Sequence, residues 1–327
     1  MEYTTLTGTG MRVSRLCLGC QGIGLDTSEK YPWSVSEAES RSILERALEL
    51  GINFYDTANS YSWGDSERVL GSVLAEHDRD WAVVATKVYY QMDDSDPNSG
   101  GLSRKTIEQQ LAGSLDRLGM DTVDLYQIHR WDEPTPIAET LRALEDLRAR
   151  GKLRYLGASS MWAYQLATTL ATSDRLHLPR FATMQPHYNL VYREIERELL
   201  PLCAQESLGV IPWSPLAGGY LARPHDQLKA TERGRTSDYL HARPYADGGG
   251  PEINERVDEL AEEHGVTMAQ LALAWLLHQP VVDAPIIGAT SVEHLEEAVE
   301  ALEVSLSGTE LEYLEEPYQP VEVYGPQ

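Results

Sequence analysis

The stretch that decides the fold of this chain is Asn53–Gly71, which reads NFYDTANSYSWGDSERVLG. Its start overlaps the apolar run Ile52–Tyr55, which is typical of a buried strand. Asp56 follows where that strand should end, and a polar turn holding Tyr61 leads into a helix near Asp65. An acid and a phenol on one loop are expected to face one cavity. On this evidence alone, a structural pair is as well supported as a catalytic pair.

Short apolar runs alternate with helix-like segments along the whole chain. The eight runs expected to form strands cover Leu16–Gly19, Ile52–Tyr55, Ala82–Thr86, Val123–Gln127, Leu153–Leu156, Ala182–Gln185, Val210–Pro212 and Ala284–Ile287. The clearest helices are expected over Ser36–Leu50, Ser66–Glu76, Ser103–Leu118, Pro136–Arg150, Ile253–His264 and Thr267–His278. Eight alternations at a spacing of about 30 residues favour a (β/α)8 barrel over a doubly wound sheet. No G-x-G-x-x-G motif follows the first run, which also disfavours the doubly wound sheet.

Three further segments complete the expected architecture. Residues 3–15 alternate polar and apolar side chains around Gly8-Thr9-Gly10, which predicts a small N-terminal β-hairpin. Residues 214–250 form the one long irregular stretch, and a loop of that length is usually functional or mobile. The acidic tail, residues 307–327, is expected to lie over the barrel mouth. Since no linker divides the chain, residues 1–327 are expected to form a single domain.

The composition restricts the class of partner. Acidic residues outnumber basic ones 51 to 27, which gives a formal charge of −24. Nucleic acid and anionic membrane surfaces would be repelled, so neither is expected as a partner. Five Lys, many acidic residues and two Phe resemble the composition of proteins from salt-loving organisms, in which screening removes the self-repulsion. A generally acidic protein from an ordinary organism is the alternative.

The three cysteines are too few to form a disulfide framework in a chain of 327 residues. Cys17 and Cys20 have the C-x-x-C spacing, but no second Cys or His pair stands nearby to complete a zinc site, so no metal is expected. The N-terminus has no signal-like segment, and no apolar run approaches the ~20 residues of a membrane span. A cytoplasmic location is therefore the expectation.

Reactive side chains recur at the ends of successive expected strands. Asp56 ends the second strand, Lys87 the third and His129 the fourth. In a barrel of this class the active site lies at the carboxyl ends of the strands. Each residue alone has an ordinary explanation, as a helix cap, a solvated cation or a core histidine. An acid, a phenol, an amine and an imidazole at neighbouring strand ends together favour a catalytic site.

These four groups suit the reduction of a carbonyl. A hydride that reaches the carbonyl carbon leaves an alkoxide, which needs a proton. Tyr61 can donate that proton, and a nearby Lys87 ammonium is expected to lower the phenol pKa from its usual ~10. Asp56 would hold Lys87, and His129 would orient the carbonyl oxygen. Removal of Lys87 is expected to raise the Tyr61 pKa and to shift the rate profile to alkaline pH.

Ordered motifs over most of the chain resemble those of the aldo-keto reductases. They are Asp56-Thr57-Ala58 with Tyr61, VVATK ending at Lys87, DLYQIHRWD around His129, GASS at 157–160, QPHYN at 185–189, IPWSPL at 211–216 and IGAT at 287–290. The YQIHRWD pattern resembles branches called aryl-alcohol dehydrogenases and members similar to potassium-channel β-subunits. The resemblance implies a (β/α)8 barrel that reduces aldehydes or ketones to alcohols, with Asp56, Tyr61, Lys87 and His129 as the catalytic four.

The resemblance also implies a nicotinamide cofactor extended across the barrel mouth and covered by residues 214–250. The positions that match the family's cofactor site are Gly19, Cys20, Gln21, Asp56, Ser159, Ser160, Gln185, Trp213, Ser214, Pro215, Leu216, Gly218, Arg223, Gly288, Thr290, His294 and Glu297. Within this set, Ser159, Ser160 and Gln185 match the carboxamide site. Trp213 matches the aromatic residue that stacks on the nicotinamide, and Ser214, Leu216 and Gly218 match the pyrophosphate loop.

The chain departs from the family pattern at the adenosine end. His294 stands where many members have Arg or Gln, and Ala298 stands where they have Asn. No Lys or Arg lies between Ile286 and Ala301, so Arg223 is the candidate cation for a 2′-phosphate. NADP(H) is the cofactor that the resemblance implies, and NAD(H) is the alternative that these departures leave open.

The expected substrate is a small carbonyl compound or the corresponding alcohol. Aromatic residues crowd the presumed mouth, namely Trp33, Trp63, Tyr89, Tyr90 and Trp131. They predict a flat apolar pocket for aromatic or medium-sized carbonyls, although each could instead pack the rim. The sequence makes no prediction of the oligomeric state.

Three other functions compete with the reductase. A non-catalytic NADP(H)-binding regulatory subunit on the same fold is disfavoured by the presence of His129. A metal-dependent hydrolase or lyase would need more carboxylate or imidazole ligands than Asp56 and His129 provide. Schiff-base chemistry at Lys87 would assign no role to Tyr61 or to the segment around Trp213.

Overall fold

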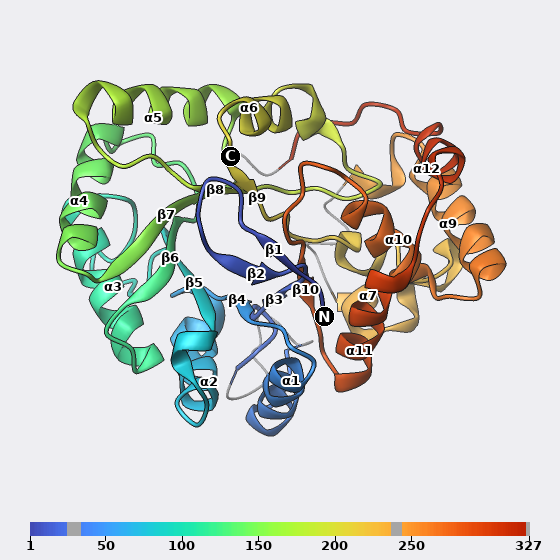
Figure 1. Cartoon of the computed structure of the whole chain (residues 1–327), viewed down its shortest axis with the longest axis horizontal. Helices are drawn as coiled ribbons and strands as arrows, with labels where there is room; N and C mark the ends of the chain where they lie inside the picture. Colours follow the sequence, from blue (N-terminus) through green and yellow to red (C-terminus); the bar gives the residue numbers. More distant parts are fainter. Residues whose placement is uncertain (25–33, 237–243, 325–327) are drawn as a thin grey trace.

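The computed structural model describes residues 1–24, 34–236 and 244–324. Eight parallel strands form a single sheet in the order β10-β3-β4-β5-β6-β7-β8-β9 (Figure 1). The strands are β3 (Cys17–Gly19), β4 (Phe54–Asp56), β5 (Val83–Val88), β6 (Val123–Ile128), β7 (Leu153–Ser159), β8 (Thr183–Gln185), β9 (Gly209–Val210) and β10 (Ile286–Gly288). Parallel bridges from Val210 to Val282 and from Trp213 to Ile286 join the two edge strands. The sheet is thus closed, and the predicted (β/α)8 barrel is confirmed.

Each strand overlaps the apolar run that predicted it, because strands of a parallel barrel are covered on both faces. The main difference is at β9, which ends at Val210 although the apolar run continues to Pro212. Proline has no N–H to donate to a ladder. The Pro212 carbonyl nevertheless accepts from the Ile286 N–H at 2.8 Å, which helps to close the barrel.

Helices surround the barrel, as Figure 1 shows. Those described are α1 (Glu37–Glu49), α2 (Asp65–Leu74), α3 (Arg104–Leu118), α4 (Ile137–Ala149), α5 (Ala163–Leu176), α6 (Leu199–Gln205), α7 (Glu232–Thr236), α9 (Gly250–His264), α10 (Met268–Leu277), α11 (Val292–Glu300) and α12 (Gly308–Glu315). The predicted capping box opens α1, where the Ser36 N–H donates to Glu39 Oε2 at 3.0 Å. None of the described helices has the length and apolar character that a membrane crossing requires.

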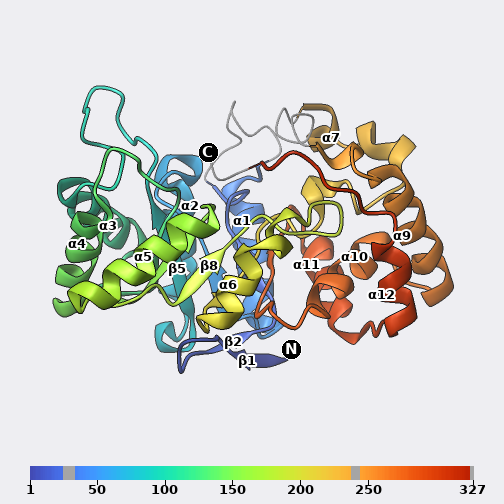
Figure 2. The same cartoon turned by 90° about the horizontal axis from the view of Figure 1, so that it is seen from above.

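The N-terminal hairpin closes one end of the barrel (Figure 2). It consists of β1 (Tyr3–Thr5) and β2 (Arg12–Ser14), which pair antiparallel as predicted. Leu6 and Val13 of the hairpin region belong to the small apolar cluster that includes Phe54. A separate, larger core cluster contains most of the other buried apolar residues. The hairpin side of the barrel interior is therefore filled by apolar side chains.

The predicted tail contains a helix, so it is not irregular throughout. A capping box at Ser307 and Glu310 begins α12. Beyond the helix, the chain runs along the end of the barrel opposite the hairpin (Figure 2). There the Tyr192 hydroxyl donates to the Tyr324 carbonyl at 2.8 Å and accepts from its N–H at 2.7 Å. Residues 214–250 are likewise not featureless, since they contain the short helices Ala217–Gly219, His225–Ala230 and α7.

Candidate active site

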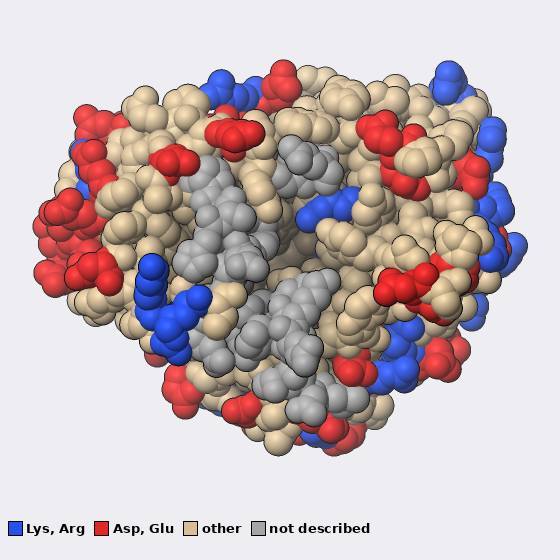
Figure 3. Space-filling view, turned by 180° about the vertical axis from the view of Figure 1, so that it is seen from behind, with Lys and Arg blue, Asp and Glu red and all other residues tan. Residues whose placement is uncertain are grey.

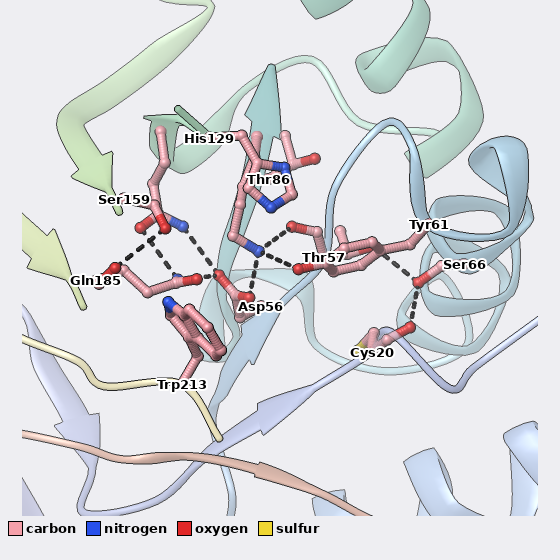
Figure 4. Close-up of polar contacts among 12 residues, drawn as sticks. Cys20, Asp56, Thr57, Tyr61, Ser66, Thr86, His129, Ser159, Gln185 and Trp213 are labelled. Atoms are coloured by element: carbon pink, nitrogen blue, oxygen red, sulfur yellow. Dashed lines mark hydrogen bonds and ion pairs between the residues drawn. The ribbon is translucent and has the colours of Figure 1, made fainter. Parts of the chain in front are cut away.

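The four predicted catalytic side chains lie together at the barrel mouth. Asp56 is the last residue of β4, Lys87 is the penultimate residue of β5, and His129 directly follows β6. Tyr61 begins the short helical turn Tyr61–Gly64 after β4. Figure 4 shows the side chains of Asp56, Tyr61 and His129 turned toward one another, with Trp213 beside Asp56.

A buried ion pair connects two of these residues. Lys87 is fully buried and Asp56 is 2% exposed. The Lys87 Nζ donates to Asp56 Oδ2 at 2.5 Å, to the Thr57 carbonyl at 3.0 Å and to the Tyr61 hydroxyl at 3.0 Å. All three ammonium protons therefore have acceptors, which is the condition under which a buried charge is tolerated.

The other carboxylate oxygen of Asp56 is satisfied by two amides. Asp56 Oδ1 accepts from Gln127 Nε2 and from Gln185 Nε2, each at 2.9 Å. Gln127 lies opposite Lys87 in the β5–β6 register. A Cβ at Gly157, which is paired with Gln127 in β7, would lie 2.9 Å from the Gln127 Cγ. Glycine at that position leaves the space that the amide occupies.

The Tyr61 side chain is held by an unusual turn. Ser62, Trp63 and Gly64 all have positive φ, at 47°, 54° and 95°. Such a backbone costs energy for residues other than glycine and is found mainly at functional sites. The residue Ser66, which follows the turn, connects it to the end of β3, because its hydroxyl donates to the Cys20 carbonyl at 2.7 Å. The phenol is thereby directed toward Lys87.

Burial sets the protonation states in the site. Burial raises the pKa of Tyr61 to about 12, although the Lys87 ammonium opposes that shift. The expectation that Lys87 brings the phenol pKa below its usual value is therefore wrong for the protein without ligands. The direction of the Lys87 effect is as expected, but desolvation is larger. Burial alone would lower the pKa of Lys87, and the attraction of Asp56 and Tyr61 raises it instead.

His129 is a buried neutral imidazole. Burial, together with the charges of Lys87 and Arg130, holds its pKa well below the usual value. Its ring meets those of Tyr61 and Tyr90 edge-on, at centroid distances of 5.7 Å and 4.9 Å. Its Nδ1 has no hydrogen-bond partner within the described part of the chain. The imidazole is thus positioned by packing and can hydrogen-bond a ligand.

A cavity of about 1330 Å³ opens at this end of the barrel. Figure 3 shows the hollow in the middle of this face. The predicted site residues that line the cavity are Gly19, Gln21, Asp56, Tyr61, Trp63, His129, Ser159, Gln185, Trp213, Ser214, Pro215, Leu216, Gly218, Arg223, Gly288, Thr290, His294 and Glu297. Lys87, Cys20 and Ser160 are buried behind the wall of the cavity.

The face of Trp213 is braced from behind. The His187 ring stacks on Trp213 at 4.2 Å between centroids, and Tyr192 stacks on His187 at 4.1 Å. The Trp213 Nε1 donates to the Ser160 hydroxyl at 3.1 Å. The Ser160 hydroxyl therefore positions Trp213 from behind the wall, whereas Ser159 and Gln185 line the cavity.

The far end of the cavity carries polar groups that suit an anion. The Nε of Arg223 is buried without a hydrogen-bond partner among the described residues. The Asn254 side chain fixes the local backbone by donating to the Arg223 carbonyl at 3.0 Å. Thr290 Oγ1 and His294 Nδ1 are 3.1 Å apart. A dinucleotide phosphate would provide the partner that Arg223 Nε lacks, so these residues fit a nicotinamide dinucleotide.

The predicted aromatic pocket is only partly present. Trp63, which is 57% exposed, and Tyr90 line the same cavity as Tyr61 and His129. Tyr89 and Trp131 instead pack against the apolar core and do not line the cavity. Trp33 lies outside the described residues. The strand periodicity does not extend into these rim loops, so it cannot determine which way their side chains face.

Among the residues of the site that were not predicted are Gln127, His187 and Arg130. Gln127 had a detectable signal, because it is a polar residue within an apolar strand and lies two positions before His129, on the same face. His187 and Arg130 had none beyond their adjacency to matched motifs. Of the described residues, no group of three or more His, Cys, Asp or Glu side chains is arranged to hold a metal ion.

The barrel and the residues at its mouth define an oxidoreductase of the aldo-keto reductase type. Residues 15–319 match the model of the aldo/keto reductase family, and the chain belongs to that family. Its members act on small carbonyl compounds with nicotinamide cofactors. The predicted family is thus confirmed.

The chain is similar over almost its whole length to fungal proteins. An aldo-keto reductase of Metarhizium robertsii is 40% identical, with 99% of this chain and 93% of the relative covered. Versiconal hemiacetal acetate reductase of Aspergillus parasiticus is 38% identical, with 99% of each chain covered. A protein of Schizosaccharomyces pombe named as a candidate aryl-alcohol dehydrogenase is 38% identical, with 99% of this chain and 97% of the relative covered.

The depressed pKa of His129 predicts a specific pH dependence of stability. In the unfolded chain the imidazole binds a proton below pH ~6.5, and in the folded protein it does so only at lower pH. The stabilisation is therefore present above pH ~6.5 and is lost as the pH falls, by up to about 1.4 kcal/mol per pH unit. Urea unfolding at pH 7.5 and 5.5 should show a larger loss for the wild type than for His129→Gln.

The matched control is His77→Gln, because His77 is exposed. This variant should retain the wild-type pH dependence. An equal loss of stability in the wild type and His129→Gln would show that His129 is protonated as easily in the folded state as in the unfolded state.

Proposed function

We propose that this protein reduces aldehydes or ketones to alcohols with a reduced nicotinamide cofactor, reversibly, and that Tyr61 donates the proton. The observation that carries the proposal is the Lys87 ammonium, which bridges the Asp56 carboxylate and the Tyr61 hydroxyl beneath the cavity. A purely structural ion pair would not need a phenol as its third partner. The cavity in front of the phenol is deep enough for a cofactor and a small substrate together.

In this proposal the substrate oxygen lies between Tyr61 and His129. The neutral His129 imidazole donates a hydrogen bond to that oxygen and orients it. When bound, the cofactor supplies a hydride to the carbonyl carbon. Tyr61, which is protonated at neutral pH, gives its proton to the oxygen. Lys87 then stabilises the phenolate from 3.0 Å, and the product is an alcohol.

The residues proposed to hold the cofactor extend across the cavity. Trp213 presents its face to the nicotinamide, and Ser159 and Gln185 lie where they can bind its carboxamide. Arg223 is the proposed partner of the 2′-phosphate, which favours NADP(H), while NAD(H) remains the alternative. Residues 214–250 would cover the cofactor, and residues 1–327 would form one domain. Because one relative is named as a candidate aryl-alcohol dehydrogenase, we propose aromatic carbonyls as substrates.

Replacement of Tyr61 by Phe tests the proton donor. The variant should bind the cofactor as the wild type does but reduce benzaldehyde about 10²- to 10⁴-fold more slowly, the usual contribution of a general acid. Tyr164→Phe is the matched control, since Tyr164 is an exposed phenol on α5. A Tyr61→Phe variant with the wild-type rate would contradict the assignment. A wild-type protein that binds the cofactor yet reduces no carbonyl would favour the regulatory alternative.

The cofactor preference can be measured by quenching of Trp fluorescence. The wild type should bind NADPH more tightly than NADH. Arg223→Gln should weaken NADPH binding about 10- to 100-fold, as expected for loss of a charge-assisted hydrogen bond, and leave NADH binding nearly constant. Equal weakening for both cofactors would place Arg223 at the shared pyrophosphate instead. Equal wild-type affinities for the two cofactors would make the enzyme a dual-cofactor one.

A further inference from the structure

Arg130 is a cation on the substrate side of the cavity that the proposed reaction does not use. It directly follows His129 and lines the cavity with Trp63, Tyr90 and Tyr61. One of its guanidinium nitrogens, Nη1, donates to the His129 carbonyl at 2.9 Å. The guanidinium carbon lies 5.9 Å from the centroid of the Tyr90 ring. These two contacts hold the cation beside the ring that packs edge-on against His129.

Arg130 has no acidic partner within 4.0 Å among the described residues, although the chain carries 51 acidic residues. Many of the other described arginines, which lie outside the cavity, form ion pairs, such as Arg117 with Glu67 at 2.7 Å and Arg79 with Asp124 at 2.8 Å. A guanidinium has five N–H donors, and one of those of Arg130 is accounted for by the His129 carbonyl. The remaining donors are available to a ligand in the cavity.

Asp132, the acidic residue nearest to Arg130 in the sequence, hydrogen-bonds to other groups. Asp132 Oδ2 accepts from the Leu102 N–H at 2.8 Å and from the Thr135 hydroxyl at 2.6 Å. These bonds tie the loop after β6 to the start of α3, and they hold the carboxylate away from Arg130. The Asp56 carboxylate is likewise neutralised by Lys87. Arg130 therefore gives the substrate end of the cavity a positive charge that these nearby acids do not cancel.

We propose that Arg130 selects substrates that carry an anionic group, and that the preferred class is aromatic aldehydes with a ring carboxylate. Trp63 and Tyr90 supply flat apolar surfaces for the ring, and the guanidinium supplies a planar pair of donors that matches a carboxylate. The inference rests on the proposed reductase function and names the substrate class for the same site.

The negative charge of the whole molecule increases the effect that a local cation has on the binding of an anionic substrate. A protein of net charge −24 repels anions in solution, so an anionic substrate gains only from a positive group close to its binding position. Within a partly enclosed cavity, a charge-assisted hydrogen bond is screened less than on the surface. Its contribution should appear mainly in the discrimination between charged and neutral substrates.

The experiment compares 4-carboxybenzaldehyde with its uncharged methyl ester. The quantity measured is the ratio of kcat/KM for the acid to kcat/KM for the ester, in the wild type, Arg130→Gln and Arg130→Lys. A general effect of the substitution on catalysis cancels in this ratio. Arg142→Gln is the matched control, because it removes an exposed arginine from α4, outside the cavity.

The ratio should fall about 10- to 100-fold in Arg130→Gln, corresponding to one charge-assisted hydrogen bond. Arg130→Lys should retain part of the ratio, and Arg142→Gln should retain all of it. A ratio that changes less than about twofold in Arg130→Gln would overturn the inference.

Failure of the underlying function gives a different result. If the wild type reduces neither aldehyde with NADPH or NADH, the reductase proposal fails and the inference fails with it. If the wild type reduces both aldehydes and the acid/ester ratio is the same in Arg130→Gln as in the wild type, only the inference fails.

Discussion

The buried ion pair between Asp56 and Lys87 is the interaction on which the site depends. Two opposite charges inside a barrel are tolerated only when every donor and acceptor is satisfied. Gln127 and Gln185 satisfy one carboxylate oxygen, and the Thr57 carbonyl and the Tyr61 hydroxyl complete the ammonium. The ion pair and its two amide partners lie on four strands, β4, β5, β6 and β8, so the register of the sheet sets their relative positions.

Burial also sets the protonation states of the neighbouring side chains. Desolvation raises the pKa of Tyr61 and holds that of His129 below its usual value, whereas the attraction of Asp56 keeps Lys87 charged. In the proposed reaction Tyr61 is the proton donor, His129 is the hydrogen-bond donor, and Lys87 is the cation that stabilises the phenolate. Around it, the Trp213 face and the Arg130 guanidinium shape the two sides of one cavity.

The sequence was sufficient to predict the barrel and the positions of Asp56, Lys87 and His129 at its mouth, because strand ends are marked by apolar runs and these residues stand at or next to them. It was insufficient for properties that depend on burial in three dimensions, such as pKa values and the direction in which loop side chains point. The net pKa of Tyr61 depends on desolvation, which no spacing encodes. The stack of His187 behind Trp213 joins segments that follow different strands. Tyr89 and Trp131 face the core because the rim loops fold back, which no periodicity predicts.

The most direct test of the central claim is the pH dependence of single-turnover benzyl alcohol oxidation in the wild type and Lys87→Met. Oxidation requires the phenolate, so below the Tyr61 pKa the rate should rise about tenfold per pH unit. Lys87 favours the phenolate, and its removal should raise the pKa further and displace the profile to alkaline pH. At every pH from 7 to 10 the variant should then be slower by about tenfold or more. Coincident profiles for the two proteins would contradict the account.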